Sequence, residues 1–447
     1  MYSLEQLRSL TVSEIKKIAQ SLSVPSPSVG RKDEIIAKIL QAQEKETQEL
    51  ENDVCKEDNV NVEQVNNAVQ HHDSVDGEGV LEIMPEGHGF LRVNNYFSSY
   101  QDIYVQQKHI NSYGLRTGDY IKGKIRKFDS TKLPSMLYVD SVNDLPLSKI
   151  SGRPNFDYLK ASFPNHRIRL ENKNNRLDFA LRAIDLIAPI GKGQRGLIVS
   201  PPKAGKTILL KKIAQAIISN HPEVHIMLLL IDERPEEVTD MEMEVDCEIV
   251  SSTFDQSAAH HIKVADLALK RAKRLVEAGR DVIILMDSIT RLSRAHNTAA
   301  ENTGRTLSGG LDAAALFEPK KFFGSARNIA DGGSLTIIAT ALIDTGSKMD
   351  DIIYEEFKGT GNMEIHLSRR LSERRIFPAI DLNVSGTRRE DLLLSDKEIS
   401  AMWLIRKVLG KNDMADSTEM LIGMLTKTIS NDEFIDRLNE NARIEKW

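Results

Sequence analysis

The chain has 447 residues, of which 40% are hydrophobic and 28% are charged, and its formal net charge is −6. This length is too great for one ordinary hydrophobic core, so we expect about two to four domains. No apolar run approaches the roughly 18 to 20 residues of a membrane span, and the first residues show no secretory signal. We therefore expect a cytoplasmic protein without a membrane partner. The two cysteines, Cys55 and Cys247, stand in no metal-binding pattern, which argues against a disulfide framework and a zinc site.

The first part of the chain is expected to hold a small helical domain and a linker. Within residues 1–43, apolar side chains such as Leu4, Leu7 and Leu10 recur at helical spacing. Residues 44–76 are polar and mostly acidic, with little to bury, which is typical of a flexible linker.

Residues 77–147 have the pattern of a small β-barrel. Short β-type segments alternate with turns rich in Gly, Asn, Pro and Ser, which favours an OB-fold or cold-shock-like barrel. Aromatic rings stack on bases while cations follow phosphates, so the barrel has a candidate surface for single-stranded RNA. Its members are Phe90, Arg92, Tyr104, Lys122 and Lys124. Composition alone leaves open a barrel whose aromatic side chains only fill its own core.

The remaining residues predict an α/β domain. Residues 148–182 form a connector that is rich in Arg and Lys, and residues 183–447 alternate apolar strands with helices. This alternation is typical of a mainly parallel sheet, so we expect a multidomain protein of helical unit, barrel and α/β domain.

A phosphate-binding loop lies near the start of the α/β domain. Backbone N–H groups and a helix N-terminus bind phosphates in such a loop, while Lys206 can reach the terminal phosphates and Thr207 can ligate Mg²⁺. The generic pattern has glycine where Ser200 stands, which weakens the signal of the loop by itself. The candidate nucleotide-binding residues of this segment are Pro201, Pro202, Lys203, Ala204, Gly205, Lys206, Thr207 and Ile208.

Two later apolar strands end in carboxylates, Glu233 and Asp287. Ligand sites in open α/β sheets lie at the carboxyl ends of strands, so both side chains are expected near the loop. Glu233 is the candidate that polarises the water attacking the γ-phosphate, and Asp287 is the candidate magnesium anchor. The loop and the two strands together predict a site that hydrolyses nucleoside triphosphates.

Further candidates lie in later loops and in arginine-rich segments. Arg305 and Gly309 share one glycine-rich loop, and Lys348 lies in another. Such loops are usually plain turns, but in a ring they can line a pore and hold a phosphate backbone. An arginine from a neighbouring subunit would stabilise charge on the γ-phosphate. The pattern does not choose among six: Arg369, Arg370, Arg374, Arg375, Arg388 and Arg389.

Five segments together closely resemble the family of the bacterial transcription termination factor Rho. They are residues 191–207, 229–238, 282–292, 332–350 and 354–364. The resemblance covers essentially the whole chain. That family also lacks the first loop glycine, which accounts for Ser200.

The resemblance implies a homohexameric ring of RecA-like ATPase domains, each with an RNA-binding barrel. Such a ring uses ATP and Mg²⁺ to move 5′ to 3′ along nascent RNA, acts as an RNA–DNA helicase and dissociates the RNA polymerase elongation complex.

The family's site residues can be matched to this chain by motif. Lys203, Lys206 and Thr207 match the residues that hold phosphates and magnesium, Glu233 the catalytic carboxylate and Asp287 the magnesium anchor. Arg388 resembles the arginine finger that the neighbouring subunit supplies, and Arg234 and Arg291 resemble further site or interface arginines. The loop from Gly304 to Gly310 and Lys348 resemble the pore loops that hold RNA.

One barrel position departs from the family, and two other functions stay open. His88 stands where the family usually has an aromatic residue, so it is expected to stack on a base more weakly. A rotary-ATPase-like subunit would explain the loop and Glu233, but not the barrel or the pore lysine. A non-catalytic single-strand RNA-binding protein would have no need of Lys206, Glu233 and Asp287 together.

Overall fold

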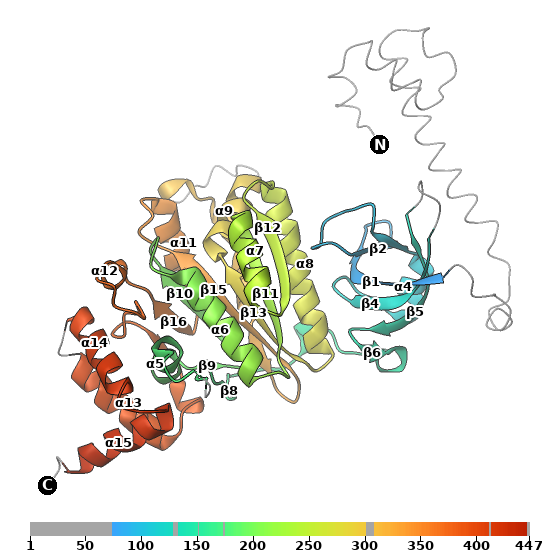
Figure 1. Cartoon of the computed structure of the whole chain (residues 1–447). Coiled ribbons are helices and arrows are strands. Elements are labelled where there is room, and N and C mark those ends of the chain that lie inside the picture. The colour runs from blue at the N-terminus through green and yellow to red at the C-terminus, as the bar shows by residue number, and fades with distance from the viewer. Residues whose placement is uncertain are drawn as a thin grey trace, which may run out of the picture. The chain divides into compact units, whose positions relative to one another are not determined.

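The computed structural model describes residues 74–127, 133–150, 152–172, 175–300, 308–410 and 413–444. The predicted helical domain at 1–43 and the predicted linker as far as residue 73 lie outside the described residues. The described residues form a β-barrel and a helix-covered sheet (Figure 1), which belong to one compact unit, Asp73–Trp447. Among the described helices, none combines the length and the apolar character that a membrane span requires.

The barrel is a six-stranded sheet in the order β3-β2-β1-β4-β5-β6, and pairing of β3 with β5 closes it. Its strands are β1 (Ser74–Ile83), β2 (Gly89–Arg92), β3 (Ile103–Val105), β4 (Tyr120–Arg126), β5 (Ser135–Val142) and β6 (Leu145–Pro146), with helix α4 (Gln107–Tyr113) before β4. Alternate residues of β4 point inward, so Ile121 and Ile125 are buried with Leu81 and Leu91 in one core. Strand β1 begins at Ser74, three residues before the predicted start of the barrel.

The basic connector is built into the α/β domain. After short turns at Leu147–Lys149 (η2) and Phe156–Tyr158 (η3), it forms the strands β7 (Ala161–Ser162) and β8 (Arg167–Ile168) and the start of helix α5 (Phe179–Ile187). Strand β7 pairs with β14 (Arg327–Ile329), and β8 pairs with β9 (Ile190–Gly191). The connector therefore adds edge strands to the domain that follows it.

The large domain has a nine-stranded sheet whose main path runs β12-β11-β13-β15-β10-β16-β17. All neighbours along this path are parallel except β16 and β17. The strands of the path are β10 (Arg195–Ser200), β11 (His225–Glu233), β12 (Glu248–Thr253), β13 (Asp281–Asp287), β15 (Ser334–Leu342), β16 (Met363–His366) and β17 (Gly386–Thr387). Because these strands are parallel, the carboxyl ends of β10, β11 and β13 lie at the same end of the sheet.

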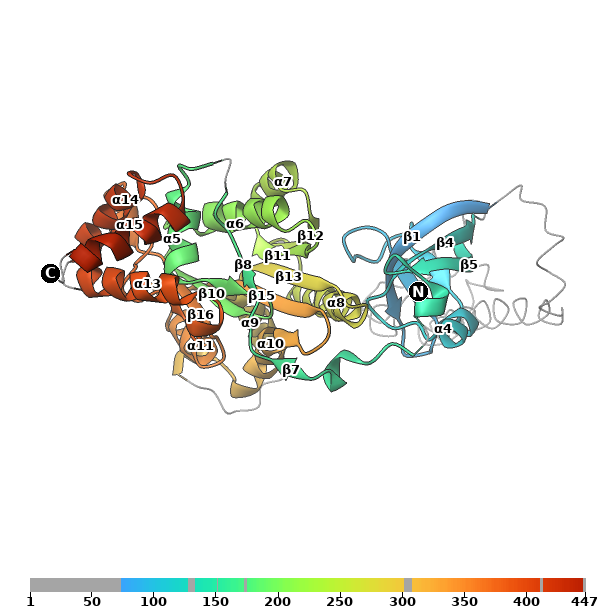
Figure 2. The same ribbon diagram turned by 90° about the horizontal axis from the view of Figure 1, so that it is seen from below.

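Helices cover both faces of this sheet (Figures 1 and 2). The helices are α6 (Lys206–Asn220), α7 (Pro235–Glu244), α8 (Ala258–Glu277), α9 (Ile289–Ala299), α10 (Phe317–Gly324), α11 (Lys348–Lys358) and the short α12 (Arg369–Glu373). Along β11, Leu228 and Leu230 join a core with α6 and α7, whereas Leu229 and Ile231 join a second core with α8 and α9. This alternation explains why the strand is apolar almost throughout: both of its faces are buried.

Three helices close the chain: α13 (Asp396–Leu409), α14 (Met414–Leu425) and α15 (Asn431–Ile444). A capping box of Ser395 and Glu398 starts α13. The guanidinium of the buried Arg182 in α5 donates to the Leu425 and Thr428 carbonyls and to Asn431 Oδ1. These bonds fix the turn between α14 and α15 against the α/β domain.

Candidate nucleotide site and RNA-binding surface

The phosphate-binding loop joins the end of β10 to the start of α6. Gly205 has a left-handed backbone with φ of 90°, which glycine adopts without steric cost and which directs the chain into the helix at Lys206. Ser200 is fully buried as the last residue of β10, and its hydroxyl donates to the Pro201 carbonyl at 2.9 Å. The hydroxyl that serine introduces in place of the usual glycine therefore has a hydrogen-bond acceptor within the loop itself.

Lys206 lies between the two carboxylates that the sequence placed near it. Its Nζ atom is 3.0 Å from Glu233 Oε1 and 2.6 Å from Asp287 Oδ2. The hydroxyl of Thr340, on the neighbouring strand β15, donates to Asp287 Oδ1 at 2.6 Å. Glu233 and Asp287 are only 3% and 1% exposed, so this is a buried charge cluster that opens only at the loop.

The charges in this cluster shift each other's protonation. Burial and the repulsion of Asp287 raise the pKa of Glu233 to about 7, although Lys206 and Arg291 oppose the rise. Burial alone would lower the pKa of Lys206, but attraction to Asp287 and Glu233 outweighs it and raises that pKa. A raised carboxylate pKa is the property of a group that can accept a proton near neutral pH.

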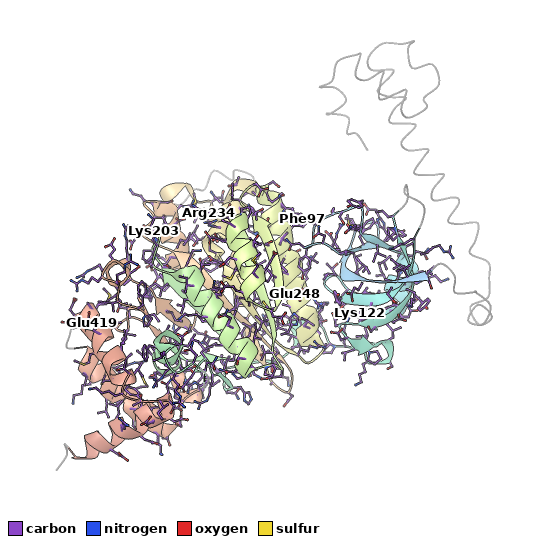
Figure 3. The ribbon with its side chains drawn as sticks, in the orientation of Figure 1. Phe97, Lys122, Lys203, Arg234, Glu248 and Glu419 are labelled. Carbon is purple, nitrogen blue, oxygen red and sulfur yellow. The ribbon has the colours of Figure 1, made fainter. Side chains whose placement is uncertain are left out.

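The other predicted residues of the loop and strand lie around this cluster. Pro201 and Ala204 are buried, Thr207 is half-buried, and Pro202, Lys203 and Ile208 are exposed. Arg234 is exposed directly after β11, and Lys203 and Arg234 lie at the same edge of the sheet (Figure 3). A guanidinium nitrogen of Arg291 is 3.6 Å from Glu233 Oε2, so this arginine also belongs to the cluster.

An apolar pocket beside the loop was not predicted from the sequence. It has a volume of 250 Å³ and is lined by Phe179, Gly205, Ile208 and Phe377 among others. The Phe377 side chain is 53% exposed, which is unusual for an aromatic ring next to a buried core. In the sequence, this pocket is marked only by an apolar Ile-Phe-Pro run within a charged segment. The run does not show which part of the chain the phenylalanine faces.

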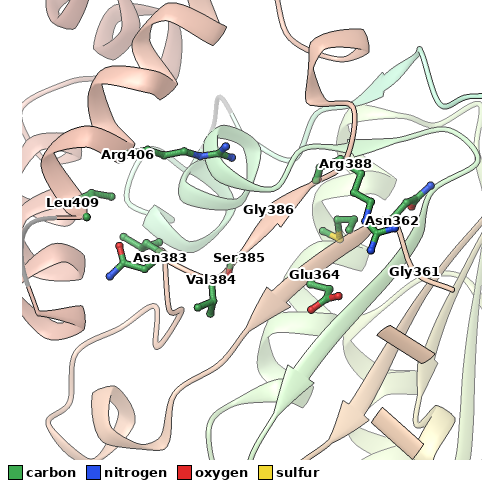
Figure 4. A pocket seen from close by; sticks show the side chains of 14 residues that line it. Gly361, Asn362, Glu364, Asn383, Val384, Ser385, Gly386, Arg388, Arg406 and Leu409 are labelled. Atoms are coloured by element: carbon green, nitrogen blue, oxygen red, sulfur yellow. The ribbon is translucent and has the colours of Figure 1, made fainter. Parts of the chain in front are cut away.

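Within one chain, Arg388 and Lys206 lie at opposite ends of the strands. Arg388 is near the amino ends of β10 and β16, whereas Lys206 follows the carboxyl end of β10. Arg388 follows β17, whose residue Thr387 pairs with Met363 at the start of β16, and its backbone N–H donates to the Asn362 carbonyl at 2.8 Å. The exposed Arg388 lines a pocket of 590 Å³ together with Glu364 and Arg406 (Figure 4).

Among the other candidate arginines, two have close carboxylate partners. Arg389 pairs with Asp391 at 3.0 Å, and Arg369 pairs with Glu373.

In the barrel, three predicted residues form one aromatic cluster. The ring centroids of His88 and Phe90 are 5.5 Å apart, those of His88 and Tyr104 5.6 Å, and those of Phe90 and Tyr104 5.8 Å. Phe90 and Tyr104 are partners in the β2–β3 register, so the pairing of the strands brings the rings together. The cluster lies outside the buried core of the barrel, which does not include these three residues.

Of the basic residues predicted for the barrel surface, Arg92 lies beside the aromatic cluster, with its guanidinium carbon 5.3 Å from the centroid of the Phe90 ring, whereas Lys122 and Lys124 lie on another strand. Arg92 is only 6% exposed, and its guanidinium is held between the carboxylates of Glu82 and Asp102. Lys122 and Lys124 lie on β4, across β1 from β2, and they pair with Asp144 and Asp76. All three cations are thus ion-paired within the chain, and their role in RNA binding stays a prediction.

The two glycine-rich loops meet in the structure. A side chain at Gly309, whose φ is 78°, would lie 3.0 Å from the Met349 backbone nitrogen and 3.2 Å from the Lys348 carbonyl carbon. The Lys348 loop is tied to helix α9, which follows Asp287, because Arg294 donates twice to Asp350 at 2.7 Å. The predicted Arg305 lies outside the described residues.

Three parts of the chain match known protein families. Residues 6–48 match the family described as Rho termination factor, N-terminal domain, and residues 77–148 match Rho termination factor, RNA-binding domain. Residues 180–387 match ATP synthase alpha/beta family, nucleotide-binding domain. The chain is 49% identical to the transcription termination factor Rho of Aquifex aeolicus, over 98% of this chain and 96% of that protein. It is 46% identical to that of Escherichia coli K12, over 98% of this chain and all of that protein.

The chain belongs to the transcription termination factor Rho family. The resemblance found from the sequence and the predicted multidomain fold are confirmed. The Rho family is one of RNA-binding, ATP-dependent termination factors, and this Rho chain carries both the RNA-binding and the ATPase domain.

Solved structures support the RecA-like fold of the Rho motor domain. The prototypical ATPase of a type III secretion system matches with a TM-score of 0.53 at 23% identity, over 70% of this chain and 93% of that one. The assembled ATPase EscN from enteropathogenic E. coli matches with a TM-score of 0.52 at 22% identity, over 70% and 78%. The shared fold accounts for the similarity of the phosphate-binding loop and Glu233 to those of a rotary-ATPase-like subunit. The match of residues 77–148 to the Rho RNA-binding domain argues against that alternative.

Proposed function

We propose that this Rho-family chain forms a homohexameric ring in the cytoplasm. The ring hydrolyses ATP with Mg²⁺, moves 5′ to 3′ along nascent RNA as an RNA–DNA helicase, and dissociates the RNA polymerase elongation complex. The observation that carries the proposal is the position of Lys206 between Glu233 and Asp287 at a phosphate-binding loop, in a chain that also carries an RNA-binding barrel.

Lys206 and the loop amides bind the phosphates of ATP. When the ammonium group turns to the phosphates, Glu233 and Asp287 lose the cation that lies between them. Oxygen donors from Asp287 and Thr207 suit Mg²⁺, which would restore positive charge at this place. Among the described residues, no cluster of three or more His, Cys, Asp or Glu side chains is placed to hold a metal ion by itself, so the remaining ligands would come from the nucleotide and water. The bound metal supplies charge neutralisation at the phosphates.

Glu233 acts on the attacking water. Its carboxylate lies at the end of β11, next to the phosphate-binding loop, and its raised pKa suits it to accept a proton from the water. The adenine ring fits the apolar pocket lined by Phe179 and Phe377, because this pocket adjoins Gly205 of the same loop.

Arg388 completes the site of a neighbouring subunit. It is exposed at the end of the strands opposite to Lys206, which supports a role in the site of another subunit rather than in its own. A guanidinium that approaches the γ-phosphate from outside stabilises the charge that develops there. A site divided between two copies requires the ring for activity.

RNA is bound in two places. The rings of His88, Phe90 and Tyr104 stack on bases at the barrel, whose cations contribute at a distance. Gly309 and Lys348, with Arg305, hold the RNA backbone in the ring and move with the nucleotide state through the contact of Arg294 with Asp350.

Steady-state ATP hydrolysis by the full chain, with and without polycytidylate RNA, tests this function. We expect RNA to raise the turnover number severalfold or more. Equal turnover in both conditions would contradict an RNA-driven motor, and no turnover in either would contradict the ATPase site. The mass of the assembled particle, measured by light scattering with ATP and RNA, tests the hexamer separately.

A further inference from the structure

Three consecutive barrel residues contact the α/β domain, and each uses its side chain. Asn95 makes three hydrogen bonds of 2.9 Å with Ser251 of β12, two to its backbone and one to its hydroxyl. Tyr96, which is 5% exposed, donates its hydroxyl proton to Glu248 Oε1 at 2.6 Å. Phe97 stacks on His260 in the first turn of α8, with ring centroids 4.1 Å apart and an angle of 17° between the planes. We call Asn95–Phe97 the coupling segment; Figure 3 marks Phe97 and Glu248.

The coupling segment continues directly from the predicted RNA-binding strand. Strand β2 carries Phe90 and ends at Arg92, three residues before Asn95. Asp102 binds Arg92 and also accepts a hydrogen bond from the Ser99 backbone at 3.0 Å. The segment is therefore fixed at its two ends by one buried ion pair of the barrel, and a shift of β2 moves both ends together.

The other side of the contact leads to the catalytic carboxylate. Strand β12 pairs with β11 with a register shift between Ile231 and Glu233, after which Thr253 is the partner of Glu233. The next residue, Phe254, donates its N–H to the Glu233 carbonyl at 3.1 Å. Ser251, which Asn95 holds, is two residues before Thr253. Backbone hydrogen bonds thus connect the coupling segment to the end of the strand that carries Glu233.

A separate contact anchors the barrel at the other end of α8. Arg153 binds Asp119 with two bonds of 2.5 Å, Asn143 donates to Asp119 at 2.9 Å, and Arg271 donates to Asn143 at 2.7 Å. These groups are buried, so the barrel stays attached without the coupling segment. A pocket of 380 Å³ lies between the two contacts, lined by Tyr96 and Glu248 on one side and by Arg271 on the other. Arg271 Nε is also 3.6 Å from Glu248 Oε1, so the anchoring contact adjoins the partner of Tyr96.

We propose that Asn95, Tyr96 and Phe97 are positioning residues through which RNA bound at the barrel sets the placement of Glu233. The proposal rests on the proposed function and names a route for its regulation. RNA that stacks on Phe90 pulls on β2, the coupling segment shifts β12, and the hydrogen bonds to Glu233 and Phe254 carry the shift to the end of β11. A contiguous chain of packed and hydrogen-bonded groups is the physical requirement for such coupling.

The test compares Asn95→Ala and Phe97→Ala in the full chain with the wild type. We measure turnover at saturating ATP with and without polycytidylate, and the Kd for a short cytidine oligonucleotide without ATP. Both variants should retain basal turnover and oligonucleotide Kd within twofold, while the stimulation by RNA falls at least threefold. Phe97→Tyr should restore stimulation because it keeps the stacked ring. Tyr100→Ala is the matched control, since this nearby ring is 84% exposed.

Full stimulation in both alanine variants overturns the proposal, and so does an equal loss of oligonucleotide affinity, which would place the segment in RNA binding. If Asn95→Ala or Phe97→Ala lowers the melting temperature, the Tyr96→Phe variant provides the test of the proposal. It keeps the buried ring and removes only the hydrogen bond to Glu248. Its stimulation should fall at least twofold, and unchanged stimulation would overturn the proposal. A wild type that RNA does not stimulate would instead show failure of the proposed function, and the coupling would fall with it.

Discussion

At the scale of single residues, the site is governed by one ammonium group between two buried carboxylates. Lys206 holds Glu233 and Asp287 together, and without a cation their repulsion would be costly in a low dielectric. In the proposed mechanism, this arrangement couples ATP binding to the release of Glu233, because Lys206 cannot bind the phosphates and both carboxylates at once.

Glu233→Gln should preserve ATP binding and reduce turnover by about 10² to 10⁴-fold, the range typical of lost general-base catalysis. The amide keeps the shape of the side chain but cannot accept the proton. Binding of a fluorescent ATP analogue and steady-state hydrolysis measure the two effects. Glu236→Gln, an exposed residue in the first turn of α7, is the matched control and should be neutral. Undiminished hydrolysis in Glu233→Gln would remove this residue from the mechanism.

The shifted pKa of Glu248 predicts that contacts at the coupling segment stabilise the fold in a pH-dependent way. Burial opposes its charge, but hydrogen bonds from His225 and Tyr96 and the charge of Arg271 lower its pKa from 4.5 to about 2. A carboxylate whose pKa is lower in the folded than in the unfolded protein stabilises the fold at pH values above its unfolded pKa. This stabilisation is lost as the pH falls from about 4.5 towards 2.

Glu248→Gln should therefore lower the free energy of unfolding by roughly 2 kcal/mol at pH 7, the scale of hydrogen bonds to a charged group. Urea unfolding at several pH values should show the difference from wild type shrinking below pH about 4.5, near the unfolded pKa. A difference that stays constant down to pH 3 would contradict the assigned charge state.

At the scale of elements, two strand pairings bring the functional groups together. The β2–β3 register stacks Phe90 beside Tyr104, and the β11–β13 pairing places Glu233 and Asp287 at one edge. The same pairing rules explain why Arg92, predicted to meet RNA phosphates, instead forms a buried ion pair with Glu82 and Asp102. Its place on β2 is as expected, but its two partners lie ten positions before and ten positions after it and meet it only through the folding of the barrel.

Phe90→Ala should weaken binding of a short cytidine oligonucleotide by about 5 to 150-fold, because stacking contributes roughly 1–3 kcal/mol per base. Basal ATP turnover without RNA should stay unchanged, since the ring lies in the barrel. Fluorescence anisotropy measures the affinity. Tyr158→Ala, an aromatic residue that is 85% exposed outside the barrel strands, serves as control. Equal affinity in wild type and Phe90→Ala would exclude the aromatic cluster as the primary RNA site.

At the scale of the whole molecule, the proposed nucleotide site draws on two chains. Lys206 follows the carboxyl end of β10, whereas Arg388 lies near the amino ends of β10 and β16, which favours a meeting of the two residues between subunits. Hydrolysis in the proposed ring then depends on which subunits are neighbours, and this can be tested by mixing.

Arg388→Ala should leave ATP affinity largely intact and reduce turnover by about 10³-fold or more, the range typical of an arginine finger. Co-assembled Arg388→Ala and Glu233→Gln subunits should regain part of the activity. Each Arg388→Ala site keeps Glu233 and can receive Arg388 from a Glu233→Gln neighbour. If both residues acted within one subunit, the mixed rings would be as inactive as either parent. Rings of each variant alone are the controls.

Much of the candidate site could be predicted from the sequence because its parts are local. Lys206, Glu233 and Asp287 each follow an apolar strand, and the rule for parallel sheets then places them at one edge. Phe377 and the coupling segment could not be predicted in this way. Phe377 acquires its role from a loop more than 150 residues earlier in the chain, and Asn95 binds Ser251, which is 156 positions away.

The sequence by itself determined the kind of chemistry: a phosphate-binding loop, two carboxylates at strand ends, and a barrel of aromatic and basic residues. These features follow from the order of residues along short segments, which sets strand, loop and helix. The tertiary structure alone decided which cations are free, which aromatic rings meet, and where the barrel touches the strand beside Glu233. The physical reason is that burial and ion pairing depend on neighbours in space. Arg92 and Arg388 show this most clearly, since both are arginines at strand ends, but only the first is buried between carboxylates.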